Sequence, residues 1–310
     1  MYNILVTSAG GDIGGNIINI LLKSRADGVK IFAADMKEHI FCENSADGFF
    51  TVPRTDAEAY GDAIVDIAAK YSIDMIIPSS EVDIMWFAAN RGRFSQKILI
   101  NGDKILDTFF DKLKTAATLN ELGIKTPDTR PLKDYSGELG FPAIIKARRS
   151  IHGKGFFIVN SKPELEAVMV RIDTEKYIIQ KYIGNADKEY TTAVFGGGAI
   201  TFRRKLTGGM TSYAEIEKIE ELEKYAAGLT EKFNITGSIN IQTREADGVF
   251  YVFEINPRIS STVLIRDHFN FCDLRLWVNS AAGRTICSIP LESVPDKGTA
   301  VLGFVYNFFG

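Results

Sequence analysis

The sequence is poor in the residues that build cross-linked proteins and zinc proteins. Only three cysteines and three histidines occur in 310 residues, and no two of them stand at a spacing typical of a zinc site. Such scattered cysteines make no disulfide framework, so we expect reduced thiols and a cytoplasmic protein. No stretch approaches the roughly 20 apolar residues of a membrane-spanning helix, and no signal-peptide pattern opens the chain.

An excess of charge of one sign is also missing. The chain has 36 Lys and Arg against 39 Asp and Glu, a net charge of -3, which argues against a nucleic-acid partner. Its composition, 45% hydrophobic and 24% charged, is typical of a folded globular protein, and its length predicts two or three domains. Any anion that it binds must therefore meet a local cluster of cations.

Strand and helix signals alternate in the first part of the chain. Apolar runs at 4–6, 29–34 and 75–78 predict buried strands, and apolar positions at helical spacing predict helices over 13–22 and 62–70. Strands separated by helices indicate a parallel α/β sheet, which binds ligands at the carboxyl ends of its strands.

Short strand-like runs dominate from Phe141 to Phe253, so the predicted fold class is α/β followed by α+β. Glycine-rich or Asp-Gly turns at 196–198 and 247–248 predict antiparallel hairpins. A helix is expected before this part at 107–122, two helices within it at 163–172 and 214–233, and one after it at 274–282. A final strand is expected at 300–306.

A glycine-rich turn, 8–15, joins the first strand to the first helix and leaves two interpretations open. Its amides and the following helix could bind the phosphates of NAD, with Asp35 on the ribose, or its glycines could serve only to pack helix on strand. The pair Tyr177 and Lys181 has a spacing found in short-chain dehydrogenases. Its flanks favour a strand, however, which makes the match accidental.

Polar side chains follow one face of a predicted hairpin near residue 250. Period-two geometry places Glu254 and Asn256 on one face of their strand, and Asn240 and Gln242 on one face of the preceding strand. Oxygen ligands of this kind suit magnesium carried with ATP, and Arg258 beyond a proline suits a phosphate. The alternative is a half-exposed hairpin with polar residues in solvent.

The run from Glu254 to Ser260 resembles the metal and phosphate motif of ATP-grasp enzymes, and with 240–242 it is most similar to one half of the carbamoyl phosphate synthetase large subunit. The resemblance implies a parallel pre-ATP-grasp domain over 1–97. It implies a two-subdomain ATP-grasp module after it, with a small central subdomain and entry helix over 98–177 and a metal-binding subdomain over 178–310.

Further site residues are implied by this resemblance alone. Lys112 and Lys146 resemble the basic residues that reach the ATP phosphates, and the segment 150–155 resembles the glycine-rich loop over the triphosphate. That loop contains His152, Gly153 and Gly155.

The nucleoside positions are implied in the same way. Gln180 and Tyr182 bound the linker that reads adenine, and Glu189 resembles the ribose-binding glutamate. The run 202–206 contains Arg203 and Arg204 and leads to a glycine turn, and it resembles the arginine strand that faces the substrate. Alternation allows only one of the two to point inward, and we expect Arg204 to join Arg258 and Lys146 as catalytic residues.

The expected function is that of an ADP-forming ATP-grasp ligase. With ATP and Mg²⁺ or Mn²⁺ held by Gln242, Glu254 and Asn256, it would convert a carboxylate to an acyl phosphate and couple it to an amine. Both substrates would be small molecules, no membrane partner is expected, and a homodimer is allowed. The alternatives are a single-module or split carbamoyl-phosphate-synthase-like enzyme acting on bicarbonate or carbamate, and an NAD-dependent epimerase or reductase.

Overall fold

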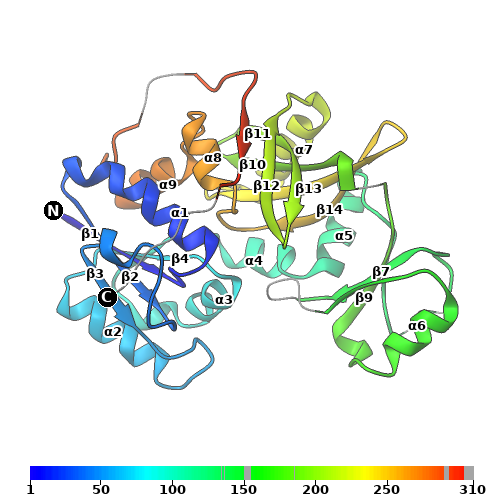
Figure 1. Cartoon of the computed structure of the whole chain (residues 1–310), viewed down its shortest axis with the longest axis horizontal. Coiled ribbons are helices and arrows are strands. Elements are labelled where there is room, and N and C mark those ends of the chain that lie inside the picture. The colour runs from blue at the N-terminus through cyan, green and yellow to red at the C-terminus, as the bar shows by residue number, and fades with distance from the viewer. Residues whose placement is uncertain (134, 136, 150–154, 185, 290–292, 304–310) are drawn as a thin grey trace. The chain divides into compact units, whose positions relative to one another are not determined.

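The chain forms two compact units. The computed structural model describes residues 1–133, 135, 137–149, 155–184, 186–289 and 293–303 (Figure 1). The first unit combines Met1–Asn101, Thr236–Ser238 and Arg258–Gly310, and the second combines Gly102–Ile235 and Ile239–Pro257. The finer division expected near residues 97 and 177 stays a prediction.

A parallel sheet forms the centre of the first unit, with strand order β3-β2-β1-β4-β5. Its strands are β1 (Tyr2–Thr7), β2 (Val29–Asp35), β3 (Gly48–Thr51), β4 (Met75–Pro78) and β5 (Lys97–Ile98). Because β1 lies between β2 and β4, the strand order reverses there, as in other doubly wound sheets. The predicted parallel α/β domain is therefore confirmed.

Five α-helices of the first unit are observed among the described residues. They are α1 (Asp12–Leu21), α2 (Tyr60–Lys70), α3 (Glu81–Ala89), α8 (Val263–His268) and α9 (Asp273–Ala282), with short 3-10 helices η1 (Leu22–Asp27), η2 (Glu43–Ser45) and η3 (Arg91–Arg93) and the short strand β15 (Thr299–Val301). The buried apolar side chains of β1, β2, β4 and α2 pack into one core, which removes apolar surface from water.

Buried ion pairs hold the C-terminal helices of this unit. Arg266 on α8 is fully buried, and its guanidinium donates two hydrogen bonds to the carboxylate of Asp273 at 2.7 and 2.8 Å. Asp267 accepts from Arg275 at 2.9 Å and from Lys23 at 2.8 Å. A buried charge is tolerated only when it is paired in this way.

The second unit contains two antiparallel sheets, with orders β14-β13-β10-β11-β12 and β6-β9-β7-β8. The strands are β6 (Thr129–Pro131), β7 (Ala143–Ala147), β8 (Phe156–Val159), β9 (Tyr177–Lys181), β10 (Glu189–Phe195), β11 (Gly198–Thr207), β12 (Met210–Ile216), β13 (Ile239–Ala246) and β14 (Val249–Asn256). Both predicted hairpins are confirmed. In the second, Asp247 and Gly248 have φ of 52° and 76°, as a type I′ turn requires.

The helices of the second unit are α4 (Asp103–Phe109), α5 (Lys112–Glu121), α6 (Lys162–Met169), α7 (Glu220–Phe233) and the 3-10 helices η4 (Thr174–Lys176) and η5 (Ala186–Lys188). Two predictions were wrong here. The helix expected over 107–122 is interrupted, because Asp111 caps a new helix. The helix expected from Ala214 starts later, because Ala214 to Ile216 pair with β11.

The remaining predictions concern two strands and the lack of a membrane-spanning helix. Tyr177 and Lys181 lie on strand β9, so the dehydrogenase-like spacing is accidental, as predicted. The strand expected over 300–306 is observed at Thr299–Val301, and residues 304–306 lie outside the described residues. Among the described residues, every helix is too short or too polar to span a bilayer.

Candidate nucleotide and metal site

The glycine turn after β1 is explained by packing within the first unit. A Cβ on Gly14 would lie 2.6 Å from the Ser8 carbonyl oxygen and 2.9 Å from Ser79 Oγ. Asp35 Oδ2 accepts a hydrogen bond from Gly10 N at 2.8 Å, and Oδ1 accepts one from the Lys37 amide at 2.9 Å. The acid that the NAD hypothesis assigns to a ribose therefore binds backbone amides instead, which favours the packing interpretation.

The predicted metal ligands lie together on one face of the β13–β14 pair. Gln242 lies directly opposite Glu254, and Asn240 lies directly opposite Asn256. The alternating residues Ile239, Ile241 and Ile255 point the other way, into the buried core of the unit. The sequence periodicity thus predicted the shared face, because the strand register pairs the polar positions with one another.

One polar atom in this group lacks a partner. The Asn240 side chain is buried; its Oδ1 accepts a hydrogen bond from Thr191 Oγ1 at 2.7 Å, and its Nδ2 has no hydrogen-bond partner among the described residues. Unsatisfied buried amides are rare in proteins, and a bound ligand or ion is one way to satisfy them. Gln242, Glu254 and Asn256 supply the hard oxygen atoms that magnesium prefers, so these residues fit the ion.

Within the described part of the chain, no richer metal cluster competes with this one. Across the described ranges, no group of three or more His, Cys, Asp or Glu side chains is placed to hold a metal. The candidate set has a single carboxylate, Glu254, with two amides. A magnesium ion at such a site would keep further positions for water or phosphate oxygens, which is how Mg²⁺ usually accompanies ATP.

Lys146 meets a break in the β13–β14 ladder. The register shifts between Gln242 and Thr243, leaving Phe253 as the extra residue of a bulge. The Lys146 ammonium donates to the Phe253 carbonyl oxygen at 3.3 Å and lies 5.7 Å from the centroid of the Phe253 ring. The bulge therefore turns a backbone carbonyl toward the lysine on β7.

Burial and neighbouring charges lower the pKa of Lys146 to about 8. Desolvation is the largest cause, the positive charges of Lys112 and Arg244 act in the same direction, and Glu254 opposes them. Coulombic effects of this size require proximity. Lys112, Arg244 and Glu254 therefore each lie within electrostatic range of Lys146 in the second unit, and a shared role at a nucleotide stays a prediction.

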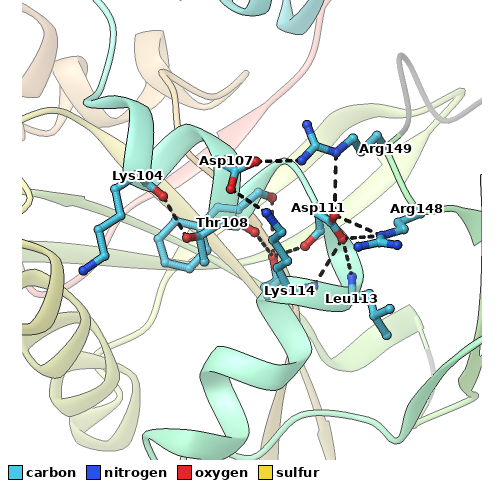
Figure 2. A network of polar contacts seen from close by, with 10 residues as sticks. Lys104, Asp107, Thr108, Asp111, Leu113, Lys114, Arg148 and Arg149 are labelled. Atoms are coloured by element: carbon cyan, nitrogen blue, oxygen red, sulfur yellow. Dashed lines mark hydrogen bonds and ion pairs between the residues drawn. The ribbon is translucent and has the colours of Figure 1, made fainter.

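A polar network fixes the start of helix α5, which carries Lys112 (Figure 2). The Asp111 carboxylate accepts from the amides of Leu113 and Lys114 at 3.1 and 3.2 Å and from Arg148 Nε at 2.8 Å. The Lys112 amide donates to the Arg148 carbonyl at 3.0 Å. Asp111 thus joins the end of β7 to the residue that the resemblance places on the phosphates.

The same network continues to a second aspartate. Asp107 accepts from Arg149 at 2.8 Å and from Lys114 at 2.5 Å (Figure 2). Hydrogen bonds from Lys114 and Arg149 lower the pKa of the exposed Asp107 carboxyl. The segment that precedes the predicted glycine-rich loop is therefore tied to helices α4 and α5.

Most of the predicted glycine-rich loop lies outside the described residues. His152 and Gly153 lie outside the described residues. Gly155 has φ of +76°, and a Cβ there would collide with the Tyr177 hydroxyl. Glycine at 155 is therefore required both by backbone conformation and by packing.

The predicted adenine linker follows β9. Gln180 is buried, and its Nε2 donates to Thr129 Oγ1 at 2.9 Å, which fixes the amide against β6. Tyr182 follows the strand, and the guanidinium carbon of Arg244 lies 5.6 Å from the centroid of its ring. An aromatic ring and a cation therefore lie together where the resemblance places the base.

Glu189 and Arg204 contact each other instead of standing at separate positions. Glu189 Oε1 accepts from Arg204 Nη2 at 2.8 Å and Nε at 3.1 Å, and both side chains are 7% exposed. Glu189 Oε2 accepts from Arg244 Nη2 at 2.9 Å and Nε at 3.1 Å. Arg203, on the alternate face, pairs with Glu215 and Glu217, so Arg204 is the inward residue of the two.

Arg244 was not among the site residues predicted from the sequence. It lies two residues beyond Gln242 on β13, so period-two alternation places it on the same face as Asn240 and Gln242. That spacing was a usable signal. Its guanidinium lies near the rings of Tyr182 and Phe253 and binds Glu189.

Arg258 belongs to the first unit. Its Nη2 donates to Glu81 Oε1 at 2.9 Å and its Nη1 donates to the Ile259 carbonyl at 3.0 Å. Both Arg258 and Glu81 are 17% exposed, so the guanidinium is held in a fixed orientation by a partly buried carboxylate. Glu81 begins helix α3, after the end of β4.

Comparison with protein families gives the class of the fold. Residues 4–100 match a family described as PylC-like, N-terminal domain, and residues 174–271 match a family described as ATP-grasp in the biosynthetic pathway with Ter operon. A parallel N-terminal sheet followed by antiparallel sheets is the corresponding architecture. The ATP-grasp resemblance predicted from the sequence is therefore matched by a family model over residues 174–271.

Individual relatives agree with this class. The chain is 22% identical over 274 residues to a carbamoyl phosphate synthase large chain of Methanocorpusculum labreanum, covering 79% of this chain and 24% of the relative, so it spans about a quarter of that protein. The structure of N5-carboxyaminoimidazole ribonucleotide synthetase from Thermus thermophilus matches with a TM-score of 0.70 at 17% identity, covering 94% and 79% of the two chains. Biotin carboxylase from Campylobacter jejuni matches with a TM-score of 0.74 at 18% identity, covering 96% and 74%.

Proposed function

We propose that this chain is an ADP-forming, ATP-dependent ligase that activates a carboxylate as an acyl phosphate and transfers the acyl group to an amine. The observation that carries the proposal is the group around Lys146. Lys146 lies within electrostatic range of Lys112 and of Glu254, and Glu254 faces Gln242 across a strand pair in an ATP-grasp fold. Phosphoryl transfer needs positioned positive charge more than covalent help from the protein.

Each residue has a defined part in this mechanism. Gln242, Glu254 and Asn256 would hold magnesium, which neutralises charge on the phosphates when bound. Lys112 and Lys146 would bind phosphate oxygens, and Arg258 would donate to the transferring group. Gln180 and Tyr182 would bound the site of the base, and His152, Gly153 and Gly155 would belong to the loop over the triphosphate.

The chemistry has two steps. A carboxylate oxygen attacks the γ-phosphorus and ADP leaves, and then an amine attacks the acyl carbon and phosphate leaves. A positioned arginine stabilises the oxyanion of the second step, and Arg204 was expected in that role. Because Arg204 forms a buried ion pair with Glu189, it could take this role only if that pair rearranges. Small-molecule substrates and a homodimeric assembly are part of the proposal, as is a cytoplasmic location, which the three free cysteines support.

Isotope transfer tests the acyl phosphate directly. The protein is incubated with ATP, Mg²⁺ and a panel of carboxylic acids paired with amines, and ADP release identifies the active pair. The carboxylate of that pair is then labelled with ¹⁸O. Because the oxygen that bridges carbon and phosphorus leaves with phosphate, one ¹⁸O atom must appear in the released phosphate. Unlabelled phosphate from a fully labelled acid would contradict the proposal.

A bicarbonate-phosphorylating enzyme is the second candidate. It is favoured by the similarity to carbamoyl phosphate synthase large chains, of which this chain spans about a quarter. In that case bicarbonate alone would stimulate ADP release without any organic acid. The two candidates share the nucleotide site, so the substrate panel separates them while the same metal and phosphate residues serve both.

A further inference from the structure

Arg244 lies beside several residues of the candidate nucleotide site in the second unit. Its guanidinium carbon is 5.6 Å from the ring centroid of Tyr182 and 5.6 Å from that of Phe253. Its positive charge also acts on Lys146. Neither the sequence motifs nor the resemblance assigned it any role.

The guanidinium is held in place at one edge only. Its Nε and Nη2 donate to Glu189 Oε2 at 3.1 and 2.9 Å, while Nη1 has no hydrogen-bond partner among the described residues. The side chain is 20% exposed, against 7% for Glu189. Because a guanidinium has five N–H donors in a fixed plane, donors remain for an external acceptor.

The charges around it are not balanced. Arg204 and Arg244 share the one carboxylate of Glu189, and Lys146 has Glu254 as a nearby carboxylate and Lys112 as a nearby cation. These six side chains carry a surplus of two positive charges. In a chain with a net charge of -3, such a local surplus favours an anionic ligand.

We propose that Arg244 binds a phosphate oxygen of the nucleotide through its outer guanidinium edge, and that Glu189 is the positioning residue that orients it. This rests on the proposed function, because it requires that a nucleotide occupies the site. A donor-only cation within electrostatic range of Lys146 favours an anionic acceptor, and phosphate matches the planar guanidinium fork. The Glu189 carboxylate, already bound to two arginines, then acts on the nucleotide through Arg244 instead of binding the ribose.

The test compares ADP with adenosine. Dissociation constants of the full chain are measured by displacement of a fluorescent ADP analogue, with Mg²⁺ present, for wild type, Arg244→Gln and Arg244→Lys. We expect Arg244→Gln to weaken ADP binding about 10- to 100-fold, the effect of losing a hydrogen bond to a charged group, and Arg244→Lys to weaken it less. Adenosine binding should change by less than about twofold, because the lost contact is to phosphate.

A matched control is available on the surface of the same unit. Arg171 follows helix α6 and is exposed, so Arg171→Gln removes the same charge and should leave both affinities unchanged. Unfolding curves of each variant establish that the folded protein is compared. Equal ADP affinity in wild type and Arg244→Gln, or an equal loss for adenosine, would overturn the assignment. A wild-type protein that binds neither ATP nor ADP would instead overturn the proposed function itself.

The positioning role of Glu189 has its own readout. Glu189→Gln should weaken ADP binding in the wild-type background and have little further effect in the Arg244→Gln background, because its action passes through Arg244. A residue that only supports the fold would lower affinity in both backgrounds by the same factor. Additive losses would therefore contradict the positioning role while leaving the Arg244 contact in place.

Discussion

The Lys146 ammonium donates a hydrogen bond to the backbone carbonyl of Phe253 at 3.3 Å, at the bulge that interrupts the β13–β14 ladder. This contact joins the strand that carries a predicted phosphate-binding lysine to the strand that carries the predicted metal ligand Glu254. The partner is a neutral carbonyl, and the lysine is 7% exposed, so its charge is poorly solvated. An anionic ligand beside it would stabilise that charge.

We predict that ATP binding weakens as the pH rises through about 8. Burial, with Lys112 and Arg244, lowers the pKa of Lys146 to about 8, so above that pH the free protein holds an increasingly neutral amine. The value of kcat/KM for ATP should therefore fall with pH above about 8. In Lys146→Arg, which keeps its charge at all accessible pH values, this fall should be absent.

We predict that Lys146 affects stability with the opposite pH dependence: the free energy of unfolding rises with pH, whereas ATP binding weakens. Because the folded state lowers the pKa of Lys146, the unfolded chain binds its proton more tightly. The free energy of unfolding should therefore gain from this group as the pH rises from about 8 toward 10.5. Urea unfolding of wild type and Lys146→Met across that range measures it; parallel curves for the two proteins would remove Lys146 as the cause.

Removal of Glu254 should abolish magnesium-dependent turnover. Glu254→Ala leaves two amides as ligands, so we expect kcat/KM for ATP to fall about 100-fold or more while the fold is retained. Glu231→Ala, on the exposed side of α7, is the matched control and should behave as wild type. Turnover of Glu254→Ala within a few fold of wild type would exclude Glu254 from the site.

Asp111 should contribute stability through its cap and its ion pair. Asp111→Ala removes the acceptor for the Leu113 and Lys114 amides and for Arg148, and we expect a loss of about 2 kcal/mol in the free energy of unfolding. Asp111→Asn keeps the cap and should lose about 1 kcal/mol. Equal losses for the two variants would mean that the carboxylate charge contributes nothing.

The difference between wild type and Asp111→Asn should depend on pH. Burial alone would raise the pKa of the Asp111 carboxyl, but hydrogen bonds from Arg148 and the Lys114 amide lower it overall. The contribution of the Asp111 carboxylate to the free energy of unfolding is therefore fully present above its unfolded pKa of about 3.9. It is lost as the pH falls through the lower pKa of the folded state. Unfolding measured from pH 7 down to about pH 2 should show a constant difference between the two proteins above about pH 4 and a shrinking difference below it.

Two glycines of the first turn test the packing interpretation. Gly14→Ala places a methyl group 2.6 Å from the Ser8 carbonyl oxygen and should cost about 2 kcal/mol of unfolding free energy. In Gly11→Ala the methyl group lies 3.5 Å from the same oxygen, so the change should be within about 0.5 kcal/mol. If Gly14→Ala is as stable as wild type, the turn is not fixed by packing.

Periodicity and turn chemistry predicted much of the fold and the metal face. Gln242 and Glu254 belong to polar positions that repeat every second residue along their strands, so their shared face follows from strand geometry. The Asp247-Gly248 turn indicated that these two strands pair. Both signals are local, and both survive in the structure because no tertiary contact opposes them.

Tertiary contacts explain what the sequence did not predict. The helix break before Lys112 depends on Asp111, whose carboxylate also binds Arg148 from a distant strand. The triad of Glu189, Arg204 and Arg244 depends on three strands lying in register. Pairings between residues far apart in the chain leave no periodic trace, so Arg244 was visible as a residue on the right face but not as a partner of Glu189.

The products formed from ATP test the central claim most directly. Phosphorus NMR spectra of the protein incubated with ATP, Mg²⁺ and the active acid and amine should show ADP and orthophosphate accumulating in equal amounts. That result follows if the γ-phosphoryl group is transferred to the acid and then released. Accumulation of AMP and pyrophosphate would contradict the account, because it would require attack at the α-phosphorus.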